Sequence, residues 1–194
     1  SSVIVGNKIG EGNLIGARYS SFYSLKFGCF LAFFNMMILL TASEFLVSII
    51  NQDPNVIEIA VLLLVFAAFF QVADALVIGA QGSLRGYKVT ISPMLIMLIS
   101  FWVLAMPFGY SLAVTDFWNI QLGAPGMWTG MCVGLFVCAS LMVWRMNFIT
   151  AKAIELQKEG LTFNQMSLDP KLKISTLFIG MLLILAFAGL IRYL

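Results

Sequence analysis

An aspartate inside a long apolar run is the residue of this chain best suited to chemistry. Asp74 lies in a run from about residue 56 to residue 80, roughly 25 residues, which is enough for a helix to cross a bilayer. A charged side chain at that depth costs on the order of 3 kcal/mol or more, so we expect it to face a bundle interior or a wet cavity. A carboxylate placed there can hold a proton or a sodium ion in one state and release it in another.

Polar and aromatic side chains share a helix face with this aspartate. Phe70, Gln71, Asp74, Ile78 and Gln81 follow one another at spacings of three and four, which places them on one stripe. We expect Asp74 to be a cation-binding or coupling residue, and a metal ligand only if the coupling ion is sodium. Gln71 and Gln81 would line the cavity, and Phe70 could offer its ring to a cation or simply pack. The alternative is a structural aspartate that is hydrogen-bonded to a neighbouring helix.

Two aromatic residues and a series of glycines complete the candidates. Trp102 and Tyr110 could line a pathway, although aromatic side chains in a bundle more often pack. Gly126, Gly130 and Gly134 recur every four residues, and this spacing predicts close packing against a neighbouring helix.

Composition restricts the class of protein. Of the 194 residues, 61% are hydrophobic and 10% are charged, and the mean hydropathy is +0.98. A soluble domain carries about a quarter charged residues, so an integral membrane protein is expected. The absence of histidine removes Ser-His and Cys-His catalysis and HExxH zinc sites. We expect no enzyme activity, no catalytic residue and no cofactor, and the net charge of +2 argues against a nucleic-acid partner.

Apolar runs and their breakers predict an all-α protein with five transmembrane helices. These spans lie at about 27–50, 56–80, 91–114, 126–148 and 174–191. Residues 6–18 hold four glycines and both charge signs, which favours a polar loop. Pro107 predicts a kink inside the third span. Residues 150–173 form a charged linker, with a short surface helix broken at Gly160 and again at Pro170.

Cations predict the orientation of the spans. Ten of the 11 Lys and Arg residues fall on one side of the alternating spans. This asymmetry predicts that the segments 6–18, 85–88 and 149–173 are cytoplasmic. The chain starts with Ser1, and residues 1–5 are typical of the last turn of an earlier helix, so we expect a fragment of a longer polypeptide.

The stripe continues into a motif that resembles a known family. Residues 71–88, with a glutamine, an aspartate three residues on and then GxLRGYK, resemble the tenth helix of NorM-type transporters of the MATE (multidrug and toxic compound extrusion) family. Residues 5–18 resemble the family's loop between helices eight and nine. Residues 102–110 and 123–135 resemble its eleventh and twelfth helices. The resemblance therefore makes residues 1–149 part of a C-terminal lobe, with 150–173 as a linker and 174–194 as an additional span.

The resemblance implies a function and a site. MATE proteins are twelve-helix antiporters whose two lobes surround a central cavity, and they export organic cations and drugs in exchange for sodium ions or protons. Asp74 matches a cation-site residue, whereas Phe70 stands where a tyrosine is common and so lacks a hydroxyl ligand. The implied partners are the lipid bilayer, the organic cation or drug, and a missing N-terminal lobe of the same polypeptide. A bacterial inner membrane is the implied location.

Two other functions remain open. One is a lipid or oligosaccharide flippase of the same superfamily, although an anionic cargo should meet intramembrane cations that the spans lack away from their ends. The other is a non-transporting membrane scaffold that associates through its glycine stripes. An intramembrane protease would need a second aspartate within a span or a Ser/His pair, and the sequence has neither.

Overall fold

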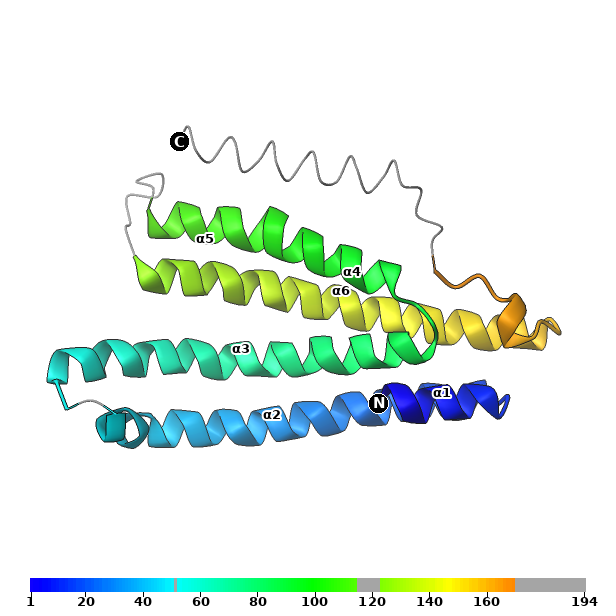
Figure 1. The fold of residues 1–194 in the computed structure, drawn as a ribbon, viewed down its shortest axis with the longest axis horizontal. Coiled ribbons are helices and arrows are strands. Elements are labelled where there is room, and N and C mark those ends of the chain that lie inside the picture. The colour runs from blue at the N-terminus through cyan, green and yellow to red at the C-terminus, as the bar shows by residue number, and fades with distance from the viewer. Residues whose placement is uncertain (51, 115–122, 170–194) are drawn as a thin grey trace.

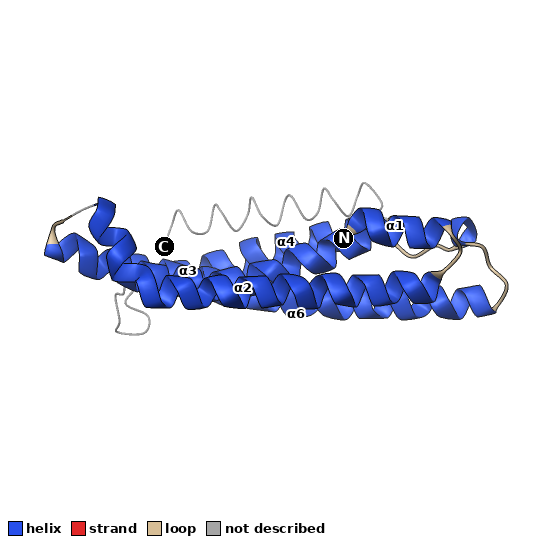
Figure 2. Ribbon diagram, turned by 90° about the horizontal axis from the view of Figure 1, so that it is seen from below, coloured by secondary structure: helices blue, strands red, loops and turns tan. Residues whose placement is uncertain are grey.

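The computed structural model of the chain describes residues 1–50, 52–114 and 123–169, so the expected fifth span at 174–191 lies outside the described residues. Within these ranges all regular structure is helical (Figure 2). The elements are α1 (Ser2–Gly10), α2 (Leu14–Ile50), α3 (Pro54–Gly86), α4 (Ile91–Leu98), the π-helix η1 (Ile99–Ala105), α5 (Met106–Ala113), α6 (Ala124–Lys158) and the short 3-10 helix η3 (Phe163–Gln165).

Long helices run up and down along one axis (Figure 1). In chain order, α2 and α3 form one antiparallel hairpin, while α4, η1 and α5 together form one rod that pairs with α6. Within the described ranges, four helical segments are long and apolar enough to cross a membrane: Leu14–Ile50, Val56–Gly86, Ile91–Ala113 and Ala124–Lys158. The expectation of an all-α, multi-pass membrane protein is confirmed.

The expected polar loop at 6–18 is wrong for most of its length. Helix α1 continues through Gly10, and α2 begins at Leu14, so only the turn at residues 11–13 is non-helical. Val5 and Ile9 are buried one turn apart, and this packing keeps the glycine-containing segment helical. Gly12 has φ of +72°, and Asn13 Oδ1 accepts a hydrogen bond from the backbone N–H of Gly16 at 2.7 Å at the start of α2.

The separate surface helix expected after the fourth span is also wrong. Helix α6 continues without a break from Ala124 to Lys158. No proline or glycine interrupts its second half, so the backbone hydrogen bonding passes straight from the apolar into the charged part of the sequence. The break expected at Gly160 is present, because Gly160 has φ of +85° and follows the last turn.

The irregularity expected near Pro107 takes the form of a wide helical turn. The π-helix η1 spans Ile99–Ala105, and Pro107 lies in the first turn of α5. Pro107 donates no backbone hydrogen bond, so the carbonyl group four residues before it has no α-helical partner. The third span is therefore one rod with a change of helix type in its middle.

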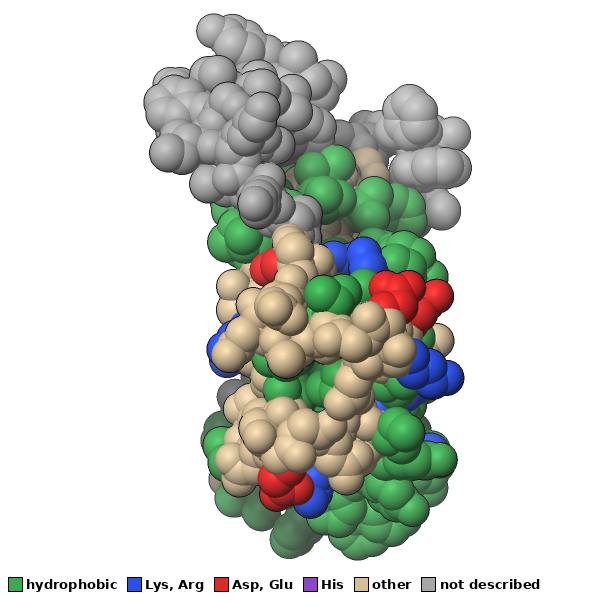
Figure 3. All heavy atoms as spheres, turned by 90° about the vertical axis from the view of Figure 1, so that its right-hand side faces the viewer, with side chains coloured by type: hydrophobic (Ala, Val, Ile, Leu, Met, Phe, Trp, Pro, Cys, Tyr) green, Lys and Arg blue, Asp and Glu red, His purple; other side chains and the backbone are tan. Residues whose placement is uncertain are grey.

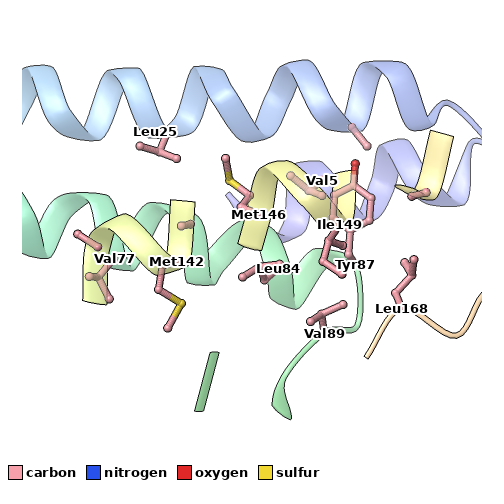
Figure 4. Close-up of a cluster of buried hydrophobic side chains, with 14 of the residues drawn as sticks. Val5, Leu25, Val77, Leu84, Tyr87, Val89, Met142, Met146, Ile149 and Leu168 are labelled. Carbon is pink, nitrogen blue, oxygen red and sulfur yellow. The ribbon is translucent and has the colours of Figure 1, made fainter. Parts of the chain in front are cut away.

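Small and apolar residues make the interior. The buried cluster joins α1, α2, α3 and α6, and Figure 4 shows Val5 and Ile149 beside the ring of Tyr87. Many large apolar side chains elsewhere are exposed, such as Phe30 and Phe45 of α2 at 67% each. Exposed phenylalanines suit a surface that faces lipid, where burying them between helices brings little gain.

Glycines of α6 set the distance to the α4–α5 rod. Gly126 faces the backbone of α5, Gly130 faces Gly109, and Gly134 faces Ala105. A Cβ atom added at Gly130 would lie 2.8 Å from the carbonyl oxygen of Ala105 and closer still to the backbone of Gly109. These contacts bring two helix backbones together with no side chain between them.

One end of the bundle is rich in cations. It carries the turns at residues 11–13 and 87–90 and the segment 159–169, and we call it the cation-rich end. Every Lys and Arg residue of the described ranges lies in the turn at residues 87–90 or in the half of its helix nearer this end. Figure 3 looks onto it and shows blue and red side chains among the backbone and polar atoms.

We predict that Gly130→Ala destabilises the protein, because its new methyl group has no space against Gly109 and Ala105. Forcing a methyl group into a packed contact costs about 1–3 kcal/mol. The melting temperature of the purified protein in detergent should fall. The matched control is Gly10→Ala, where an added Cβ would meet nothing within 4 Å. An unchanged melting temperature for Gly130→Ala would show that α5 and α6 are not held in this contact.

We predict that Tyr87→Phe is neutral or stabilising. The Tyr87 side chain is 1% exposed, and its hydroxyl oxygen has no hydrogen-bond partner among the described residues. Burial raises the pKa of Tyr87 to about 12, against the opposing effect of Arg18. Ionisation of Tyr87 therefore does not affect the free energy of unfolding below about pH 10, and the protein loses stability as the pH rises from there toward about 12, because the buried site disfavours the phenolate. Removing an unpaired hydroxyl should cost nothing, whereas Tyr87→Ala should lose about 3–5 kcal/mol. Thermal unfolding at pH 7 checks both, and a clear loss in Tyr87→Phe would contradict the unpaired state.

Candidate functional site

A groove lies between α3 and the α4–η1 rod. Its volume is about 610 Å³, and it is open along one side. The residues that line it are Gln81, Arg85, Thr90, Pro93, Met94, Met97, Leu98, Phe101 and Trp102. The sequence-based candidates Gln81 and Trp102 are thus brought to one cavity, whereas the other groove residues were not singled out as site residues.

The groove is polar at one end and apolar along its wall. Gln81, Arg85 and Thr90 stand toward the cation-rich end, while methionine and aromatic side chains follow from α4 into η1. The amide nitrogen of Gln81 lies 3.5 Å from the sulfur of Met97, which joins the two sides. Methionine side chains are flexible and polarizable, so this wall can adapt to apolar ligands of different shapes.

Asp74 lies farther along the face of α3 that carries Gln81. The two residues are seven positions apart, about two turns or ~10 Å along the helix axis. Asp74 is partly buried and forms no hydrogen bond or ion pair with any residue of the described ranges. Its carboxylate therefore stands within the apolar span with its hydrogen-bonding capacity open to a cation, a proton or another polar group.

The neighbours of Asp74 on this face differ in their environment. The side-chain carbonyl oxygen of Gln71 is buried and has no hydrogen-bond partner within the part of the chain that the structure describes. The Phe70 ring packs edge-on against Trp128 of α6, with ring centroids 6.4 Å apart. This contact agrees with a packing role for Phe70. Gln71 in contrast keeps an unused acceptor, and an unpaired buried acceptor costs about 1–3 kcal/mol.

Tyr110 lies apart from the groove. It belongs to α5, beyond the π-helix, and is partly buried, but it is not a groove-lining residue. The described ranges contain no group of three or more His, Cys, Asp or Glu side chains that could hold a metal ion.

A polar cluster beside the groove was missed by sequence reasoning. The carboxylate of Asp169 accepts hydrogen bonds from the backbone N–H groups of Thr90 at 2.9 Å and Ile91 at 2.7 Å. It also accepts from Ser92, through the backbone N–H at 3.1 Å and the hydroxyl at 2.7 Å. Burial by itself would raise the pKa of Asp169, but these hydrogen bonds outweigh it and lower the pKa below its ordinary value.

Arg145 of α6 completes this cluster. Its Nη2 atom donates to the Ser92 hydroxyl at 3.0 Å and to the carbonyl oxygen of Leu168 at 3.4 Å. Ser92 therefore stands between a guanidinium group and a carboxylate. The partners come from three distant parts of the chain, so no local sequence pattern could have predicted the cluster.

Comparisons of the sequence with known proteins identify its family. The sequence model of the MatE family matches residues 1–111. The chain is 36% identical over 149 residues to "Multidrug resistance protein MdtK" of Pectobacterium atrosepticum, an alignment that covers 77% of this chain and 33% of the relative. It is also 36% identical over 152 residues to "Probable multidrug resistance protein NorM" of Pasteurella multocida, covering 78% of this chain and 33% of that relative.

The chain spans about a third of the length of these curated relatives. The family match covers more than half of the chain and includes α1, α2, α3, α4 and η1. The resemblance seen in the motifs is confirmed: this chain belongs to the MatE family, and it is a multi-pass membrane protein.

Proposed function

We propose that the chain forms most of the C-terminal lobe of a cation-coupled multidrug antiporter. One observation carries the proposal: Asp74 lies without a partner among the described residues, inside an apolar span, on the same face of α3 as a groove residue. Family membership and the names of the two relatives support drug export as the activity.

The mechanism that we propose uses Asp74 as the coupling site. A carboxylate within the bilayer is stabilised by binding a proton or a cation, and the bound species can exchange when the lobes rearrange. Gln71 and Gln81 would supply amide oxygens or N–H groups along the path, and Trp102 an aromatic surface for an organic cation. We propose that the coupling ion is either sodium or a proton. Phe70 brings no hydroxyl ligand and packs on Trp128.

Transport of this kind needs partners beyond the described helices. Alternating access moves one lobe against another around a shared site, and this chain spans only a third of its relatives. We therefore propose that it works with a second, N-terminal lobe of the same polypeptide. The cation-rich end would face the cytoplasm of a bacterial inner membrane, in keeping with the positive-inside rule.

A flippase for lipid or oligosaccharide is the second candidate, and Arg85 is the observation in its favour. This cation lines the polar end of the groove, next to a wall of methionines and aromatic rings. An amphiphile with an anionic head could place its head at Arg85 and its chain along that wall. The scaffold hypothesis has less support, because Gly126, Gly130 and Gly134 are already covered by α5 and η1 of the same chain.

We predict that Asp74→Asn in the complete polypeptide abolishes coupled efflux while insertion stays normal. The amide has nearly the shape of the acid but cannot release a proton and binds a cation weakly. Efflux of a fluorescent organic cation should be measured after separate sodium and pH jumps, and the jump that drives the wild type identifies the coupling ion. Glu44→Gln is the matched control, because it removes an exposed acid from α2. Normal efflux by Asp74→Asn would make Asp74 structural and exclude it as the coupling site.

We predict that Trp102→Ala raises the half-saturating drug concentration by about three- to tenfold. Trp102 is 49% exposed and lines the groove, so its loss removes an aromatic surface that a planar cation can contact. Dose-dependent efflux with a planar aromatic cation checks this. Trp144→Ala is the control, since Trp144 is 64% exposed on α6 and stacks on Phe148 outside the groove. Equal effects of the two substitutions would argue against binding in the groove.

A further inference from the structure

The start of α4 is capped by a residue far away in the sequence. The first N–H groups of a helix have no partner within the helix, and a side chain at the N-cap usually accepts from them. Here the N-cap residue Thr90 makes no such side-chain bond. The carboxylate of Asp169, 79 residues beyond Thr90, accepts from three successive backbone N–H groups instead. A negative charge at this helix end is also favoured by the helix dipole.

The same carboxylate ties α4 to α6. The Ser92 hydroxyl donates to Asp169 at 2.7 Å and accepts from Arg145 at 3.0 Å, and Ser92 is only 7% exposed. Two opposite charges thus hold one buried hydroxyl from either side. Hydrogen bonds to charged groups are about twice as strong as neutral ones. We call the three residues Asp169, Ser92 and Arg145 the α4 clamp.

The α4 clamp lies at one end of α4, and the π-helix η1 follows at the other end. Thr90, Met94 and Met97, which line the groove, lie on α4 or directly before it. Beyond α4 the chain enters η1, whose π-type hydrogen bonding is less regular than that of an α-helix.

Farther along the rod, α5 is fixed. The backbone of Gly109 lies directly against Gly130 of α6, so α5 cannot shift without breaking that contact. Among the described residues, α4 packs on α6 much less extensively than α5 does, and the contact of α4 with α3 is slight. Any movement of the rod is therefore expected on the α4 side of η1.

We propose that Asp169 is a positioning residue for transport: through the clamp it fixes the cation-rich end of α4, and its release lets α4 swing about η1 and changes the width of the groove. The role in transport rests on the proposed function. The position of α4 does not, and it can be measured without a drug.

The first experiment measures the distance across the groove in the complete polypeptide. Its native cysteines are replaced, and Gln81→Cys and Met97→Cys are introduced as a pair, because the native side chains meet across the groove, with Gln81 Nε2 3.5 Å from Met97 Sδ. A short bifunctional methanethiosulfonate reagent then cross-links the pair in the absence of drug. With Asp169→Ala or Asp169→Asn added, the cross-linking rate should fall by up to about fivefold, because the loss of one helix cap shifts the equilibrium between the clamped and released positions of α4 by about that factor.

Two controls separate movement of α4 from general loss of structure. Gly28→Cys with Ala75→Cys reports the α2–α3 contact, where a Cβ at Gly28 would lie 3.9 Å from the carbonyl oxygen of Ala75, and its cross-linking should be unchanged by Asp169→Ala. Glu159→Gln removes an exposed acid from the same end of the bundle and should leave both pairs unchanged. For transport, we expect Asp169→Asn to raise the half-saturating drug concentration at normal membrane abundance.

Each outcome decides the proposal. Slower cross-linking of the groove pair alone supports the clamp. Unchanged cross-linking of that pair in both Asp169 variants overturns it, and an equal loss in both cysteine pairs overturns it too, because Asp169 would then only stabilise the fold. If the groove pair alone slows but the wild-type polypeptide exports no organic cation, the clamp stands and the proposed function fails.

Discussion

Direct contact between the backbones of Gly130 and Gly109 joins α6 to the rod that carries one wall of the groove. Within a bilayer, helices gain little by burying large apolar side chains against each other, because lipid tails are equally apolar. Close approach at small residues supplies the attraction instead. The same limit explains why phenylalanines of α2 stay exposed while alanines such as Ala73 and Ala80 of α3 are fully buried.

The sequence predicted the spans well and the helix ends poorly. Apolar length determines where a chain can cross a membrane, so the first four expected spans correspond to helical segments of the structure. The loop expected at residues 6–18 was wrong because it was inferred from the glycines. Burial of Val5 and Ile9 on one face of α1 outweighs the low helix propensity of Gly6 and Gly10. The helix end expected after residue 148 was also wrong. A change from apolar to charged side chains alters the environment that a helix prefers, but it does not break the backbone hydrogen bonding of the helix.

Spacing along one helix could be predicted from the sequence, whereas the contacts between separate helices could not. The stripe that joins Asp74 to Gln81 follows from spacing along α3, and of the two only Gln81 lines the groove. Which other element closes the groove could not be predicted, because Thr90, Met97 and Trp102 come together with α3 only through the tilt of a separate rod. Asp169 illustrates the same limit. A cap contributed from 79 residues away leaves no periodicity or motif in the sequence near α4.

The π-helix η1 also bears on how this chain tolerates changes in length. A π-type turn holds about one residue more than an α-helical turn, so deleting one residue within Ile99–Ala105 can restore α-helical geometry there while both flanking faces keep their orientation. Helix α6 contains no π-type turn that could absorb a deletion. A deletion there would rotate every later side chain by about 100°, turning Gly134 away from Ala105 or Arg145 away from Ser92. Among related sequences, single-residue gaps in the third span should therefore collect within η1.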